Sequence, residues 1–171
     1  MPPWFDVPPQ AYGGIESLVA DLVDAMVGRG HSVFMVGAGR DGTRAQFSRT
    51  YEVAPSERIG EAMPEVLHTV WSNLYLDELD IDVIHDHSLA GPVTARGRQA
   101  PTVVTAHGPC AGEMLSYYRA VCADTSLVAI SDSQRQLAPD VRWTATVHNA
   151  VKAADFRFRE RKRTGCCSSA G

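Results

Sequence analysis

Apolar residues near the start of the chain recur with the period of an amphipathic helix, which predicts a helix over residues 15–27. Its apolar positions are Ile15, Leu18, Val19, Leu22, Val23, Met26 and Val27. Gly13 and Gly14 stand directly before it. Because the first turn of a helix has unpaired N–H groups and glycine has no side chain to block an approach, this pair predicts a site for a phosphate or a sugar oxygen. Taken alone, two glycines before a helix are more often only a turn.

Short apolar runs alternate with helical patterns along the rest of the chain. Strands are predicted at residues 33–36, 47–54, 83–85, 102–105, 127–130 and 144–147. Helices are predicted at residues 57–79, 92–98, 114–122 and 131–137. This alternation predicts an α/β fold, a doubly wound parallel sheet with right-handed crossovers.

The helix predicted at residues 57–79 has one apolar side, and Pro64 is expected to kink or divide it. That side consists of Ile59, Met63, Val66, Leu67, Val70, Leu74 and Leu79.

Polar residues follow several of the predicted strands. They include His87, His107, Ser131 and Asn149, and ligands of parallel sheets gather at the carboxyl ends of strands, so we expect these residues to meet at one edge. Ser131 equally suits the N-cap of the next helix. His85 lies within an apolar strand and is expected to be a core histidine. Without a third ligand nearby, His85 and His87 do not predict a metal site.

Four segments resemble, in order and spacing, the N-terminal domain of family 4 glycosyltransferases, which have the two-domain GT-B fold. They are residues 12–16 (Tyr-Gly-Gly-Ile-Glu), 82–88 (Asp-Val-Ile-His-Asp-His-Ser), 102–108 (Thr-Val-Val-Thr-Ala-His-Gly) and 129–133 (Ala-Ile-Ser-Asp-Ser). The resemblance covers roughly residues 2–158 and implies a Rossmann-like domain. It also implies retaining transfer of a hexosyl group from a nucleotide-diphosphate sugar to an acceptor hydroxyl, with no metal and no cofactor.

The resemblance also implies roles for individual residues. His107 would be catalytic, because a histidine after this strand lies near the reacting sugar in the family; the alternative is a loop histidine that only binds backbone. Gly13 and Gly14 would face the donor diphosphate and the acceptor, and His87, with Asp86 and Ser88, would line the acceptor pocket. Asn149 and Ser131 are further substrate-binding candidates. Asn149 stands where the family usually has Asn-Gly, but Ala150 replaces the glycine.

One expected element is missing from the sequence. In the family a first strand precedes the glycine loop, whereas here twelve residues precede Gly13 and four of them are proline. We therefore expect the strand to be absent, which would leave unpaired strand edges, lower stability and promote self-association.

The main donor-binding residues of the family belong to its second domain, and no segment here supplies them. The chain therefore resembles the acceptor-side half of a glycosyltransferase, and we expect it to be inactive in isolation. A catalytically inactive fragment, truncated or frame-shifted, is one alternative. A small nucleotide- or sugar-binding module is another, although residues 12–16 do not match a Gly-x-Gly-x-x-Gly loop.

Length and composition limit these interpretations. The 171 residues suffice for one domain, expected at residues 1–151. This part carries ten arginines against eighteen acidic residues, whereas residues 152–171 carry six basic residues against two acidic ones and show no sustained periodicity. We expect a disordered or aberrant basic tail, and the acidic body argues against a nucleic-acid partner. No apolar run could span a membrane and no secretory signal is evident, so a cytoplasmic protein with free cysteines is expected.

Overall fold

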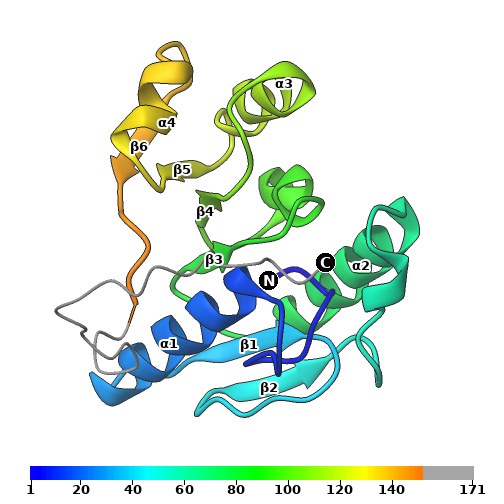
Figure 1. The fold of residues 1–171 in the computed structure, drawn as a ribbon. Coiled ribbons are helices and arrows are strands. Elements are labelled where there is room, and N and C mark those ends of the chain that lie inside the picture. The colour runs from blue at the N-terminus through cyan, green and yellow to red at the C-terminus, as the bar shows by residue number, and fades with distance from the viewer. Residues whose placement is uncertain (152–171) are drawn as a thin grey trace, which may run out of the picture.

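The structure, a computed structural model, describes residues 1–151, and the expected tail at residues 152–171 lies outside them. Strands and helices alternate along the chain, as the sequence predicts (Figure 1). The helices are α1 (Gly14–Gly28), α2 (Ala62–Leu76), α3 (Gly112–Val121) and α4 (Asp132–Leu137), with 3₁₀ turns η1 (Ser56–Arg58) and η2 (Gly91–Gly97). The strands are β1 (Phe34–Gly37), β2 (Gln46–Arg49), β3 (Ile84–Asp86), β4 (Thr102–Ala106), β5 (Ser126–Ala129) and β6 (Trp143–Thr146).

All strand pairs are parallel, which confirms the predicted α/β class. β3, β4, β5 and β6 pair in that order, and β1 pairs separately with β2. The larger sheet packs α3 and α4 over a core centred on Leu127, which is fully buried. A second apolar cluster joins α1 to β1 through Val19, Val23 and Met35, and Val7 of the N-terminal segment packs into it.

The two sheets are not joined to each other. No strand among residues 1–151 lies between β1 and β3, and a cavity of about 440 Å³ separates them. Residues of several elements line the cavity, among them Val23, Met35, Ser72 and Ile84. Figure 1 shows β1 and β2 together beside α1, with β3 to β6 leading away from them. Among the described residues, β1 and β3 therefore each have one unpaired edge.

Two observations indicate that the cavity suits a strand. Met1 lies at its border, where burial lowers the pKa of the Met1 amino group. Thr69 also lines the cavity, and its buried hydroxyl has no hydrogen-bond partner within the described residues. A buried polar group without a partner is costly, and the peptide groups of an added strand could supply one.

α2 differs from its prediction in three ways. It spans Ala62–Leu76, with the separate turn η1 before it, whereas one helix was predicted over residues 57–79. Pro64 causes no kink, because it lies in the first turn, where its missing N–H has no helical partner. The apolar side faces outward: Met63, Val66, Val70 and Leu74 are all exposed. The buried positions instead are Pro64, Glu65, His68, Thr69 and Ser72. The spacing correctly predicted a helix with one apolar side but could not reveal that this side would lie in solvent.

The open edges of β1 and β3 yield the first prediction. Adding an apolar, β-branched segment of about six residues before Met1, a usual strand length, should raise the melting temperature by several degrees. The added strand would pair both edges at once and fill the cavity.

An extension of equal length made of glycine and serine is the control and should leave the melting temperature unchanged. Amide hydrogen exchange in β1 and β3 should slow only with the apolar extension. If both extended chains melt like the natural chain, the gap does not accept a strand.

Candidate functional site

Two histidines meet at the carboxyl ends of neighbouring strands. His87 follows β3 and His107 follows β4, and because these strands pair in parallel register their ends lie side by side. His87 Nδ1 and His107 Nε2 are 2.9 Å apart and share a hydrogen bond, with ring centroids 5.2 Å apart. His87 is buried and His107 is partly buried. The structure therefore brings these two candidate residues together.

Both rings are neutral near pH 7. Burial lowers the pKa of His107 to about 4, and burial together with the neighbouring histidines holds the pKa of His87 well below its usual value. One ring must therefore donate the shared hydrogen bond and the other must accept it. In either arrangement one of the two outer ring nitrogens is a donor and the other is an acceptor. The outer nitrogen of His107, the more exposed of the two residues, could therefore form a hydrogen bond with a hydroxyl group in either tautomer.

His85 does not occupy the core position expected for it. Its side chain is exposed, because β3 is an edge strand beside the gap, and its Nε2 lies 2.8 Å from Thr105 Oγ1 on β4. Its ring packs on His87 with centroids 4.1 Å apart, as expected for residues i and i+2 of one strand.

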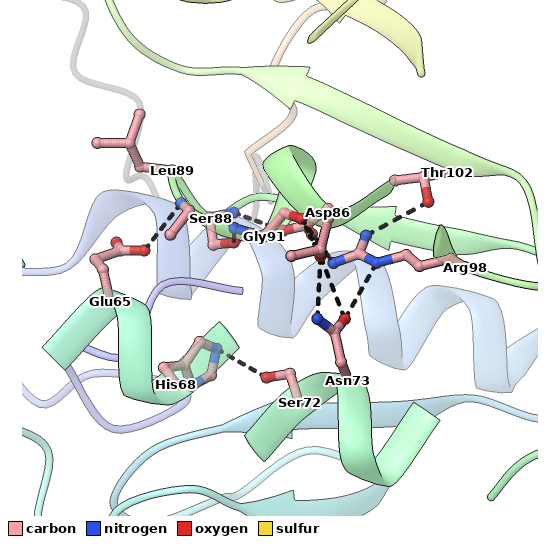
Figure 2. Close-up of polar contacts among 12 residues, drawn as sticks. Glu65, His68, Ser72, Asn73, Asp86, Ser88, Leu89, Gly91, Arg98 and Thr102 are labelled. Carbon is pink, nitrogen blue, oxygen red and sulfur yellow. Dashed lines mark hydrogen bonds and ion pairs between the residues drawn. The ribbon is translucent and has the colours of Figure 1, made fainter. Parts of the chain in front are cut away.

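A buried ion pair fixes the turn that carries His87. Arg98 Nη2 lies 3.0 Å from Asp86 Oδ2, and both side chains are less than a tenth exposed (Figure 2). Asp86 Oδ1 also accepts hydrogen bonds from the Ser88 backbone and hydroxyl, at 2.9 and 2.7 Å. Burial alone would raise the pKa of Asp86, but the Met1 amino group, Arg98 and the Ser88 donors hold it below its usual value. A side chain at Gly91 would overlap Asp86 Oδ2.

The same network reaches α2. Arg98 Nε donates to Asn73 Oδ1 at 3.3 Å, and the Ala90 backbone donates to Glu65 Oε2 at 3.3 Å, so α2 is tied to the residues that follow β3 (Figure 2). Asp86, which was expected to line the acceptor pocket, is therefore a buried residue whose partners all belong to the protein itself. Nothing in the sequence pattern marked Arg98 or Asn73 for this role, because their partners are distant along the chain.

The loop carrying His107 is held by α3 and α4. The buried Gln134 side chain donates to the carbonyls of Ala106 and Gly108, at 2.9 and 3.0 Å. The Tyr118 hydroxyl accepts from the Gly108 backbone at 3.1 Å. Hydrogen bonds therefore hold the two residues beside His107, Ala106 and Gly108, in place. Sequence analysis missed Gln134, although its place one turn after a predicted helix start was a weak signal.

Within the described residues, the remaining candidates form no hydrogen bond with the histidine pair. Ser131 caps α4, and its Oγ accepts from the Gln134 backbone at 3.1 Å. Asn149 is exposed, three residues past the end of β6. The alternative interpretation of Ser131 as an N-cap is therefore confirmed.

The glycine loop at the start of α1 is partly occupied by the protein itself. Gly13 has a φ of +146°, and a Cβ there would lie 2.7 Å from Pro9 and 3.2 Å from Glu16 Oε2. Glu16 is buried, and burial raises its pKa. Gly14 has open space around it. A phosphate at this helix start would share it with a carboxyl group, whereas a neutral hydroxyl would meet no such competition.

Several other properties can be stated for the described part of the chain. It contains no group of three or more histidine, cysteine or acidic side chains arranged for a metal ion. None of its helices has the length and apolar character needed to cross a bilayer. Cys110 and Cys122 are free thiols, as predicted.

Removing Arg98 tests the buried pair. Arg98→Ala should lower the free energy of unfolding by about 3–5 kcal/mol, because it leaves the Asp86 carboxylate buried without its partner. Arg96→Ala is the matched control, since the Arg96 side chain is 82% exposed and pairs with Asp124 at the surface; its loss should cost less than about 1 kcal/mol. Urea unfolding measures both, and similar losses would show that the buried pair has no special role.

His68 yields a prediction on pH. It is buried between the Thr50 and Ser72 hydroxyls, and burial lowers its pKa to about 3. Unfolding restores a pKa of about 6.5, so the unfolded chain binds a proton that the folded chain excludes between these values. The stabilisation is complete above pH 6.5 and declines as the pH falls, by at most about 1.4 kcal/mol per unit.

The measurement is urea unfolding at pH 7 and pH 5. His68→Gln should reduce the difference in unfolding free energy between the two pH values, while His31→Gln, at an exposed position, should leave it unchanged. Equal pH dependence in the natural chain and His68→Gln would contradict the assignment.

Comparison with known proteins identifies the family. No curated protein matches the chain. The family model described as Glycosyltransferase Family 4 matches residues 12–154, which include the glycine loop, the histidine pair and Asn149. Since the match covers most of the chain, the protein belongs to glycosyltransferase family 4.

Proposed function

We propose that the chain forms the acceptor side of a glycosyltransferase. Joined to a donor-binding domain, it would transfer a hexosyl group from a nucleotide-diphosphate sugar to an acceptor hydroxyl. Family membership supports the class of reaction. The observation that carries the proposal is the neutral His87–His107 pair at the carboxyl edge of the parallel sheet, where such folds bind ligands.

His107 is the residue proposed to contact the reacting sugars. In the transfer, the acceptor oxygen bonds to the anomeric carbon, the bond from that carbon to the diphosphate breaks, and the acceptor proton passes to the departing diphosphate or to water. With a pKa of about 4, His107 is neutral at pH 7 and cannot act as an acid there. It can instead orient a hydroxyl by hydrogen bonding, with His87 fixing which of its nitrogens bears the proton.

The start of α1 is proposed to bind hydroxyl groups of the acceptor. Gly14 has open space around it at the first turn of the helix, while the Glu16 carboxyl beside Gly13 disfavours a second anion. We propose that Ser131 and Asn149 border the same site near the sheet edge. Because nucleotide-diphosphate sugars are the proposed donors, we expect the protein to act in the cytoplasm.

The test uses the chain alone and fused to the donor-binding domain of another family member. The isolated chain should show no transfer from any nucleotide sugar. In an active fusion, His107→Ala should lower kcat by about 10²-fold, the loss expected when a reacting hydroxyl is misplaced by about 1 Å. His31→Ala is the control and should keep full activity, because His31 lies exposed after α1.

Circular dichroism should show that both variants remain folded, since neither position is part of the apolar core. Unchanged kcat in His107→Ala would reduce His107 to a loop residue that binds only His87. Transfer by the isolated chain at an enzyme-like rate would overturn the division into acceptor and donor halves.

A further inference from the structure

The backbone of β1 offers hydrogen-bonding groups to the cavity between the two sheets. The Val33 and Gly37 carbonyls point the other way, because they accept hydrogen bonds from backbone N–H groups on the β2 side, at 2.9 Å each. Backbone groups of successive strand residues point to opposite edges, so the N–H and C=O groups of Phe34 and Val36 point into the gap. β1 pairs only with β2 among residues 1–151, and these groups therefore have no strand partner there.

β3 presents the same pattern from the other side of the gap. The Ile84 N–H donates to the Pro101 carbonyl, just before β4, at 3.0 Å. The N–H and C=O groups of His85 therefore point away from β4 and into the gap. An extended peptide carries N–H and C=O groups along both of its edges and can pair with β1 and β3 at once, whereas an acyl chain or a sugar has no such pattern.

Met1 shows how wide the gap is where β1 and β3 end. A Cβ added to Gly37, the last residue of β1, would lie 3.4 Å from Met1 Sδ. Burial lowers the pKa of the Met1 amino group, and the nearby carboxylate of Asp86, the last residue of β3, opposes this shift. One residue thus reaches both strand ends, which is the width that a single inserted strand needs. The cavity of about 440 Å³ also falls within the roughly 300–1,000 Å³ of ligand pockets.

α1 and α2 cover opposite faces of the gap. Phe47 of β2 packs into the apolar cluster that joins α1 to β1. Thr50 comes three residues later, where the ladder with β1 still continues, so its side chain points to the opposite face. There the Thr50 hydroxyl shares a hydrogen bond of 2.7 Å with His68 Nδ1 of α2. A peptide in the gap would therefore have a strand at each edge and a helix on each face, since both helices line the cavity.

The two helices present different chemistry to the gap. α1 lines it with the apolar side chains Val19, Leu22, Val23 and Met26. α2 lines it mostly with polar side chains, namely His68, Thr69 and Ser72, together with Leu76. The Thr69 hydroxyl is buried and has no hydrogen-bond partner within the described residues, and a hydroxyl side chain on that face of a bound strand could supply one. Because side chains of a strand alternate between its faces, the gap favours a segment in which apolar residues alternate with serine or threonine.

We propose that the gap binds an extended peptide segment of another chain as a strand between β1 and β3, with apolar side chains toward α1 and serine or threonine side chains toward α2. About six residues suffice, a usual strand length. The inference concerns binding between chains and does not depend on the proposed function. It goes beyond the strand extension described above, because it assigns a sequence pattern to the ligand and needs no covalent link.

Fluorescence anisotropy with a labelled peptide tests the proposal. The probe is Lys-Lys-Thr-Val-Thr-Val-Thr-Val, in which the lysines maintain solubility, and the matched control has the same composition in the order Lys-Lys-Thr-Thr-Thr-Val-Val-Val. The alternating peptide should bind saturably and at least about tenfold more tightly, because only alternation places all three valines against α1. Equal binding of the two peptides, or no binding of the alternating one, would overturn the proposal.

A second control separates strand pairing from apolar contact alone. Methylation of the three valine backbone nitrogens removes the donors along one edge of the peptide and should weaken binding by at least about tenfold. If the methylated peptide binds as tightly as the probe, the peptide does not pair as a strand and the proposal fails.

Amide hydrogen exchange, followed residue by residue by NMR, locates the bound peptide. Exchange at the Phe34, Val36 and His85 N–H groups should slow when the peptide saturates the protein. β2 and β6 also have an open edge each, but among the described residues only the gap has strand edges on two sides. Protection confined to β2 or β6 would place the peptide at an outer edge and contradict the proposal.

Thr69→Val tests the polar face of the gap. The change removes the hydroxyl and keeps the shape of the side chain, so binding of the alternating peptide should weaken about fivefold, as expected for one hydrogen bond. Thr144→Val is the matched control, because Thr144 is exposed on β6 and lies outside the gap, and it should leave binding unchanged. Circular dichroism should show that both variants are folded. Equal affinity of Thr69→Val and the natural chain would overturn the assignment of hydroxyl side chains to the α2 side.

Discussion

The buried ion pair between Asp86 and Arg98 organises the edge of the sheet on which the site depends. Two charges removed from water are stable only when they are paired and otherwise hydrogen-bonded. Ser88 and Asn73 supply these further bonds, one from the turn after β3 and the other from α2. The pair thereby holds β3, η2 and α2 in one arrangement, and His87 leaves the strand from a fixed position.

The gap between β1 and β3 lies against the polar side of α2. The polar residues of α2 face the interior. There the His68 ring shares a hydrogen bond with the hydroxyl of Thr50, the residue that follows β2. The Thr69 hydroxyl has no hydrogen-bond partner among the described residues. The interior beside α2 is therefore lined by polar side chains, and the apolar side of the helix is left exposed.

Local signals in the sequence were sufficient to predict most elements. The glycine-bounded pattern of α1, the β-branched run of β4 and the Ser131 cap each depend on neighbours within one or two turns, and all three appear as predicted. Residues held by distant partners were not predictable. Arg98 pairs across twelve residues and Gln134 bonds across more than twenty, and neither shows periodicity that reveals the partner. The exposure of the apolar side of α2 and of His85 depends on how these elements pack in space, which the spacing of apolar residues along the chain does not specify.

NMR titration of the histidine imidazoles tests the central claim most directly, that His87 and His107 form a neutral, hydrogen-bonded pair at the sheet edge. Carbon and nitrogen shifts of each ring report its protonation and tautomer. The account predicts that both rings are neutral at pH 6, that one bears its proton within the shared hydrogen bond, and that His107 titrates with a pKa of about 4. Two rings that titrate independently near pH 6.5 would show that the pair does not form.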